Sequence, residues 1–215
     1  MTEIWVGAVI VGVVLIGWLI QELINAPAER EFERQVKERL EGQARKRGGS
    51  VGTFGRRAEL TVPYKGLSIE VSTAGSDSDD GGSTEHTYAR FQTDVFNDKE
   101  FKFFLDSKNL LLKPLVFGAR VEVPDEEFRE KYIVAGNDAS FVNDVLTREI
   151  RDKLLEESLQ VKFGSRTDSF VLSRERGWLS VFTPGKWAGG GILDALIETA
   201  ILFYERLEAL NRQAG

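Results

Sequence analysis

Few residues of this 215-residue chain have the types and spacing that chemistry requires. One acidic stretch reads Asp77-Ser-Asp-Asp-Gly-Gly82, and carboxylates at alternate loop positions can converge on calcium. With Asp77 as the first position, however, the fifth ligand is Gly81, and Tyr88 stands where a bidentate Glu is required. We therefore interpret the stretch as part of a solvent-exposed loop and expect no metal.

A glycine-rich stretch, Gly185–Gly191, precedes a predicted helix. Backbone N–H groups at a helix N-terminus can bind phosphate. The Gly185-Lys186 pair is not followed by Ser or Thr, as a phosphate-binding loop requires. We interpret the stretch as a flexible entry to the helix and expect no cofactor.

The remaining candidates are one histidine and a short acidic run. The chain has no cysteine and only His86, which excludes disulfides, thiolate metal sites and zinc sites with several histidines. No nucleophile motif accompanies His86, so we predict that it faces solvent. Asp125, Glu126 and Glu127 could act as acids or bases, but helix and turn starts also favour acids because of the helix dipole. We predict that the chain is not an enzyme.

The composition limits the kind of partner. With 28 basic and 34 acidic residues the net charge is −6, which argues against a nucleic-acid binder. Hydrophobic residues make up 42% of the chain, as in a soluble globular protein, but one end of the chain carries a continuous apolar run. Ile4–Ile20 is a run of 17 residues with no charged or strongly polar side chain. The average hydrophobic content therefore conceals a segment that is far more apolar than the rest of the chain.

We predict that residues 1–24 form a single transmembrane anchor. At about 1.5 Å per residue, the apolar run covers about 25 Å, and Leu23 and Ile24 extend it toward the roughly 30 Å hydrocarbon core. Trp5 and Trp18 lie near its ends, where indole rings favour lipid headgroups. Membrane lipids are thus one expected partner.

The flanks predict that the anchor is retained and how it is oriented. Ala26-Pro27-Ala28 is similar to a signal-peptide cleavage site, but Met1-Thr2-Glu3 lacks the positive charge of a signal peptide. Only Glu3 precedes the run, and seven basic residues follow it: Arg30, Arg34, Lys37, Arg39, Arg45, Lys46 and Arg47. By the positive-inside rule, the N-terminus lies outside and the C-terminal domain is cytoplasmic.

Small residues inside the run would let another helix pack closely. Gly7, Gly12 and Gly17 recur every five residues, and Ala8 with Gly12 forms a small-xxx-small pair. We take these four residues as candidates for packing against other integral membrane subunits.

Residues 25–49 predict a charged juxtamembrane helix that ends at Gly48-Gly49. Phe32, Val36 and Leu40 are spaced by four and form a narrow apolar stripe, which we take as a candidate partner surface. Two interpretations remain open: a solvated stalk with i,i+4 ion pairs, and a helix lying on the membrane surface. Trp178 and Trp187 are candidates for a second partner surface.

Residues 50–215 predict one α+β domain in which two long amphipathic helices cover a mostly antiparallel sheet. Alternation on either side of Pro63–Gly66 predicts a hairpin, and residues 75–83 predict a mobile loop. Further strands are predicted at 88–95, 101–105, 115–123, 132–135, 159–163, 170–173 and 178–182, the last two forming a hairpin. The helices are predicted to begin after Asp138, continuing to Leu154, and to run from Ile192 to Asn211.

One segment resembles a known family. Residues 123–134 read V-P-D-E-E-F-R-E-K-Y-I-V, and Asn137-Asp138, Leu146-Thr147 and Leu154 follow. With this D-x-E-F-x-x-x-Y-x-V pattern, the C-terminal half of the chain resembles a bacterial, membrane-anchored domain family of unknown function. Members often have two membrane spans, whereas this chain shows one. The resemblance implies membrane association and an α+β domain, and it brings no catalytic residues.

Together these features predict a non-catalytic accessory, structural or assembly subunit of a larger integral membrane complex, such as a respiratory or photosynthetic one. The first alternative is a membrane-tethered binding module for a lipid, an anion or a peptide. The second is a tethered hydrolase, which would need two convergent carboxylates in one pocket.

Overall fold

The computed structural model describes residues 31, 33–54, 57–77, 83–92, 101–107, 118–157, 159–163, 178–184 and 190–214. The chain divides into two compact units, residues 1–40 and 41–215. The predicted anchor lies outside the described residues, and with it Trp5, Gly7, Ala8, Gly12, Gly17 and Trp18. Among the residues that are described, no helix combines the length and the apolar character that a membrane crossing requires.

A helix occupies residues 33–47, in agreement with the charged helix predicted there. It ends at Gly48, whose φ of 68° is a left-handed conformation that glycine adopts without a steric penalty. The Gly49 N–H donates to the carbonyl oxygen of Ala44 at 2.8 Å, which completes a Schellman-type end. On its exposed side, Arg34 pairs with Glu31 at 2.7 Å and Glu38 at 2.8 Å, the spacings expected of a charged helix.

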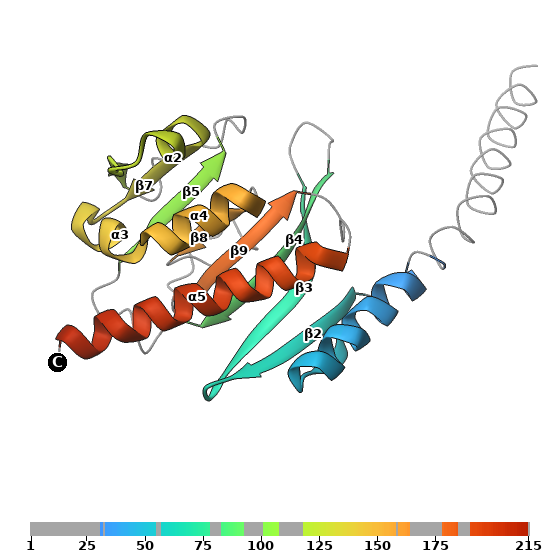
Figure 1. Cartoon of the computed structure of the whole chain (residues 1–215). Helices are drawn as coiled ribbons and strands as arrows, with labels where there is room; N and C mark the ends of the chain where they lie inside the picture. Colours follow the sequence, from blue (N-terminus) through green and yellow to red (C-terminus); the bar gives the residue numbers. More distant parts are fainter. Residues whose placement is uncertain are drawn as a thin grey trace, which may run out of the picture. The chain divides into compact units, whose positions relative to one another are not determined.

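The described strands of the second unit form one sheet in the order β1-β2-β3-β4-β9-β8-β5-β7-β6 (Figure 1). Their bounds are β1 Ser50–Phe54, β2 Arg57–Tyr64, β3 Leu67–Asp77, β4 Ser83–Gln92, β5 Phe103–Ser107, β6 Ala119–Arg120, β7 Tyr132–Gly136, β8 Gln160–Phe163 and β9 Trp178–Pro184. All neighbouring strands pair antiparallel. The predicted α+β class and antiparallel sheet are confirmed.

The predicted hairpin is β2 and β3. Lys65 and Gly66 have φ values of 46° and 87°, the two left-handed residues of a type I′ turn, whose twist suits a hairpin. Beyond the hairpin, β3 continues to Asp77 and pairs there with Ser83. The strands thus enter the predicted loop at 75–83, because ladder hydrogen bonds come from the backbone and polar side chains do not prevent them. Residues 78–82, with most of the calcium candidate, lie outside the described residues.

The other strand predictions are confirmed in part. Strands occur near 88–92, 103–105, 132–135, 160–163 and 178–182. Of the strand predicted at 115–123, the described part has only β6, and residues 121–123 lead without ladder pairing into Pro124. Residues 170–173 lie outside the described residues, and β9 pairs with β4 on one side and β8 on the other.

The other helices among the described residues are α2 Glu126–Lys131, α3 Ala139–Val145, α4 Arg148–Glu157 and α5 Gly190–Ala214. α5 confirms the helix predicted at 192–211, but the helix predicted from Asp138 to Leu154 is wrong as one element. Leu146 leaves the helical region with ψ at 64°, and Thr147 starts α4 by accepting the Ile150 N–H on its hydroxyl at 3.4 Å. Asp138 caps α3, as predicted, by accepting the Phe141 N–H at 2.8 Å.

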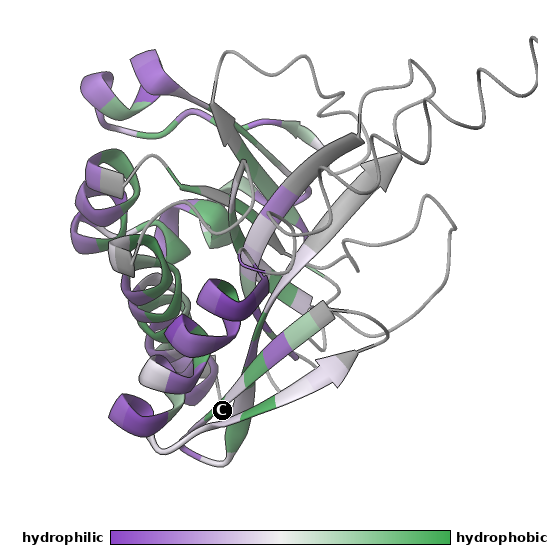
Figure 2. Ribbon diagram, turned by 90° about the vertical axis from the view of Figure 1, so that its right-hand side faces the viewer, coloured by the Kyte–Doolittle hydropathy of each residue, from purple (hydrophilic) through white to green (hydrophobic). Residues whose placement is uncertain are grey.

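The core lies between the sheet and α3, α4 and α5, which cover one face of it (Figure 2). Seven residues in register across the sheet, each at most 4% exposed, form an apolar row: Leu60, Val71, Ala89, Val181, Val161, Leu105 and Val134. From α5, Phe203 stacks on Phe103 with ring centroids 6.2 Å apart, and Tyr204 lies edge-on to Phe91 at 5.8 Å. This packing fixes which face of α5 remains toward solvent.

Candidate functional site

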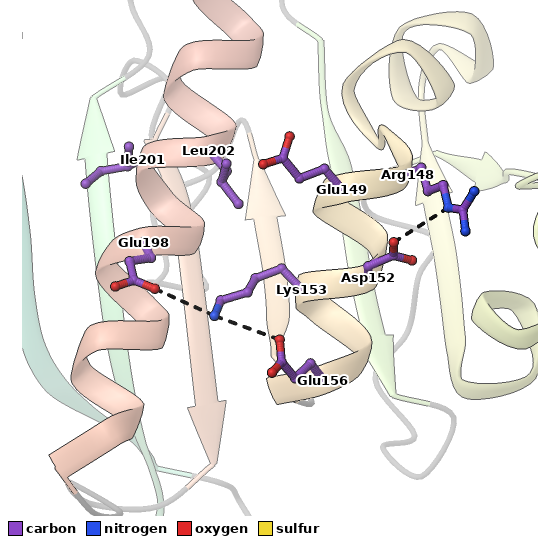
Figure 3. A pocket seen from close by; sticks show the side chains of 8 residues that line it. All are labelled: Arg148, Glu149, Asp152, Lys153, Glu156, Glu198, Ile201 and Leu202. Atoms are coloured by element: carbon purple, nitrogen blue, oxygen red, sulfur yellow. Dashed lines mark ion pairs between the residues drawn. The ribbon is translucent and has the colours of Figure 1, made fainter.

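An open groove of about 770 Å³ lies between α4 and α5 on the side away from the sheet (Figure 3). α4 contributes Arg148, Glu149, Asp152, Lys153 and Glu156, and α5 contributes Glu198, Ile201 and Leu202. The groove forms there because α4 directs its buried residues, Ile150 and Leu154, to the core. Its charged residues are left on the opposite face of the helix.

Ion pairs cross the groove and follow its α4 wall. The Lys153 ammonium lies 3.6 Å from a carboxylate oxygen of Glu198 and 4.0 Å from one of Glu156. Arg148 and Asp152 pair at 3.7 Å with side chains that are 88% and 61% exposed. Exposed pairs of this kind contribute at most about 1 kcal/mol each, so they exchange readily for charges of a partner. With four acidic and two basic lining residues, the groove has a formal charge of −2.

The groove also exposes aliphatic surface. Ile201 and Leu202 are half-buried, although their neighbours Ala200 and Phe203 are 0% exposed. Ile201 belongs to the apolar side of α5, and the structure places it in the groove wall. Six of the eight lining residues are charged and two are aliphatic, so the groove offers a bound molecule both ion pairs and an apolar contact.

A second set of charges joins the end of the helix at 33–47 to α5. The Asp194 carboxylate accepts hydrogen bonds from Lys46 and Arg47 at 2.6 Å each and from Gln43 at 2.9 Å. Burial raises the pKa of Asp194, but these three hydrogen bonds outweigh it and lower the pKa to about 2. Arg47 also pairs with Glu198 at 3.3 Å, so this network reaches the groove.

The acidic run before Phe128 has a structural role. Asp125 caps α2 by accepting the Phe128 N–H at 3.1 Å and pairs with Arg151 at 2.9 Å. The Phe128 hydrogen bond, together with Arg151, holds the pKa of Asp125 below its usual value. Glu126 and Glu127 are exposed in the first turn of α2. This arrangement agrees with the helix-start interpretation of the three acids.

The segment that carries the family resemblance is likewise built around packing. Phe128 is 0% exposed and stacks on Tyr132 with ring centroids 4.9 Å apart. The Tyr132 hydroxyl donates to the carbonyl oxygen of Leu154 at 2.7 Å, which ties β7 to α4. In this motif, Asp125 therefore caps a helix, Phe128 packs in the core, and Tyr132 links β7 to α4 by a hydrogen bond.

Other predicted site residues lie elsewhere. His86 does not simply face solvent, since it is half-buried with its ring edge-on to Phe182 at 5.6 Å. Trp178 is half-buried, and the guanidinium of Arg90 lies 4.6 Å from its ring centroid, a cation–π contact. Val36 and Leu40, which were predicted to form part of an apolar partner surface, are buried, with 6% and 0% of their surface exposed. Phe32, Trp187 and Gly185–Gly189 lie outside the described residues.

Within the residues that the structure describes, no three His, Asp or Glu side chains are grouped to hold a metal ion. Comparison with known proteins found that no family model, no curated protein and no solved structure matches this chain. The resemblance of residues 123–154 to a bacterial membrane-anchored family stays a prediction.

Proposed function

We propose that this protein is an accessory or assembly subunit of a larger integral membrane complex. Its N-terminal apolar run anchors it, and the groove between α4 and α5 contacts another subunit. The observation that carries the proposal is the groove itself, which pairs exchangeable surface charges with half-exposed Ile201 and Leu202. Partner surfaces combine a charged rim with apolar side chains that become buried on association.

The contact between residues 43–47 and α5 supports a structural role. The end of the helix at 33–47 belongs to the folded unit that begins at Glu41. Three of its side chains, Gln43, Lys46 and Arg47, meet the carboxylate of Asp194. These hydrogen bonds hold residues 43–47 against α5, an arrangement that suits a structural subunit.

The groove also favours a second candidate, a membrane-tethered module that binds a peptide. Helices and extended peptides both bind in grooves between helices. The two candidates differ in persistence, because a subunit stays bound at fixed stoichiometry, whereas a module releases its ligand on dilution.

Native mass measurement after mild detergent extraction from the membranes of the source cell tests the proposal. We expect the 24.1 kDa chain to travel in a larger assembly at fixed stoichiometry. Migration as a lone chain would overturn the subunit proposal, and an assembly that dissociates on dilution would favour the tethered module.

The anchor is tested separately by membrane fractionation. Val13→Arg places a charge at the centre of the apolar run, where it costs about 3 kcal/mol, and should move the chain out of the membrane fraction. Gln21→Arg, just beyond the run, is the matched control and should leave the chain membrane-bound. A reporter that is active only in the cytoplasm, fused to Gly215, tests the proposed orientation.

A further inference from the structure

We propose that the α4–α5 groove binds a basic amphipathic helix of the partner subunit. This inference rests on the proposed function and names the chemistry of its partner. The bound helix presents three Lys or Arg side chains along one side and an apolar side chain next to them.

The spacing of the α4 acids determines the spacing of the partner's basic residues. Glu149, Asp152 and Glu156 line the same groove wall at positions i, i+3 and i+7. At about 1.5 Å per residue this acidic stripe is about 10 Å long, two turns of a helix. A partner helix with basic residues at i, i+3 or i+4, and i+7 has the same period, so each basic residue reaches one acid.

The negative charge of the groove determines the sign of the charge on its partner. Asp152 and Glu156 are 61% and 71% exposed, and Glu149 is exposed as well. Lys153 is only 23% exposed and lies between Glu156 and Glu198, so its positive charge is directed at acids of the groove itself. The net charge of −2 therefore acts on whatever enters, which disfavours phosphate, anionic lipid headgroups and acidic peptides.

The apolar wall determines the amphipathic character. Leu202 and Glu149 stand on opposite walls and face each other across the groove (Figure 3). A helix in the groove would bury Leu202 and Ile201 under its apolar side chains while its basic side chains turn toward α4. Burying these two side chains contributes the affinity, and the charges select the register.

The test uses the full chain in nanodiscs of uncharged phosphatidylcholine and a designed helical peptide with two Leu and three Lys on one side. A peptide with Glu in place of Lys is the ligand control. The groove variant carries Glu149→Gln, Asp152→Asn and Glu156→Gln. Its matched control carries Glu122→Gln, Glu127→Gln and Glu130→Gln near α2, which likewise removes three exposed acids and disrupts two surface ion pairs.

We expect the groove variant to weaken Lys-peptide binding about tenfold, as three surface charge pairs would, and the α2 variant to leave it unchanged. We also expect the groove variant, but not the α2 variant, to release the chain from its native assembly. The groove inference would be overturned if both variants weakened Lys-peptide binding equally, or if neither variant weakened it. An assembly that survives the groove variant would overturn this inference and leave the proposed subunit function standing. A lone chain in native membranes would overturn the subunit function, and the peptide measurement would still decide what the groove binds.

Discussion

Asp194 is the residue whose replacement tests the contact between the end of the helix at 33–47 and α5. Its carboxylate accepts hydrogen bonds from Gln43, Lys46 and Arg47. The substitution Asp194→Asn keeps the size of the side chain and removes its charge. We therefore expect a loss of stability that depends on pH.

The size of the loss follows from the pKa. The pKa of Asp194 falls from 3.8 to about 2, and at about 1.4 kcal/mol per pH unit the whole shift corresponds to roughly 2.4 kcal/mol. Because the side chains of Asp194 and Lys46 are 29% and 58% exposed, solvent screening reduces the contribution to about 1 kcal/mol. For a folded unit of this size, that lowers Tm by about 2–4 °C.

The pH dependence has a definite sign. A carboxyl group whose pKa is lower in the folded state stabilises the fold above its unfolded pKa, and that stabilisation disappears as the pH falls through the folded pKa. The wild-type advantage over Asp194→Asn should be complete above about pH 5, about half near pH 3, and nearly absent at pH 2.

Thermal unfolding of the full chain in detergent micelles, followed by near-ultraviolet circular dichroism from pH 3 to 7, measures this difference. Asp152→Asn is the control, because its pair with Arg148 is longer and more exposed, and we expect it to cost under about 0.5 kcal/mol. The reasoning is refuted if Asp194→Asn loses no more stability than the control, or if its loss is the same at pH 3 and pH 7.

Two further substitutions test local features by urea denaturation of the same preparation. Asp125→Ala should lower the free energy of unfolding by about 1–2 kcal/mol because it removes the cap of the Phe128 N–H, whereas Asp125→Asn keeps a capping oxygen and should cost less; equal losses would contradict a capping role. Gly118→Ala should cost about 2 kcal/mol or more, because φ is 130° and the new Cβ would collide with the carbonyl of Gly136. Gly52→Ala, which meets nothing within 4 Å, is its control, and a Gly118→Ala loss as small as that of the control would contradict the strain.

Local signals predicted the parts of the fold that depend on neighbours in the chain. The two-residue turn at Lys65-Gly66 follows from glycine chemistry and from alternation in the strands around it. The periodic apolar residues of α5 predicted a helix, and Leu193, Leu196 and Leu207 are at most 1% exposed. In both cases the local conformation is determined by residues that are close together in the sequence.

The apolar periodicity gave a wrong prediction between Asp138 and Leu154, because it continues across the break between α3 and α4. Val142, Val145, Ile150 and Leu154 are all buried, at the spacing of one helix, although α3 and α4 are separate. Both helices pack on the same core, so the apolar spacing persists while the backbone turns at Leu146. The capping hydroxyl of Thr147 was the sequence signal of a new start.

The order of the strands depends on pairing between distant segments. β9 lies between β4 and β8, so residues 178–184 pair with residues 86–92. Alternating residues show that a strand has a buried face, but they carry no information about which strand lies beside it. The sequence therefore predicted the sheet and its antiparallel character without its order.

The groove was missed for the same reason, but one of its features was visible in the sequence. Its walls come from residues 148–156 and 198–202, which only the packing of α4 against α5 brings together. The apolar stripe of α5 is wider than its core contacts require, since Ile201 and Leu202 remain half-buried after Ala200 and Phe203 have filled the core. A helix that served only the core would gain from polar residues at those two positions, because aliphatic surface left in water favours association. These half-buried apolar residues, next to the acids of α4, are the feature on which the proposed partner site rests.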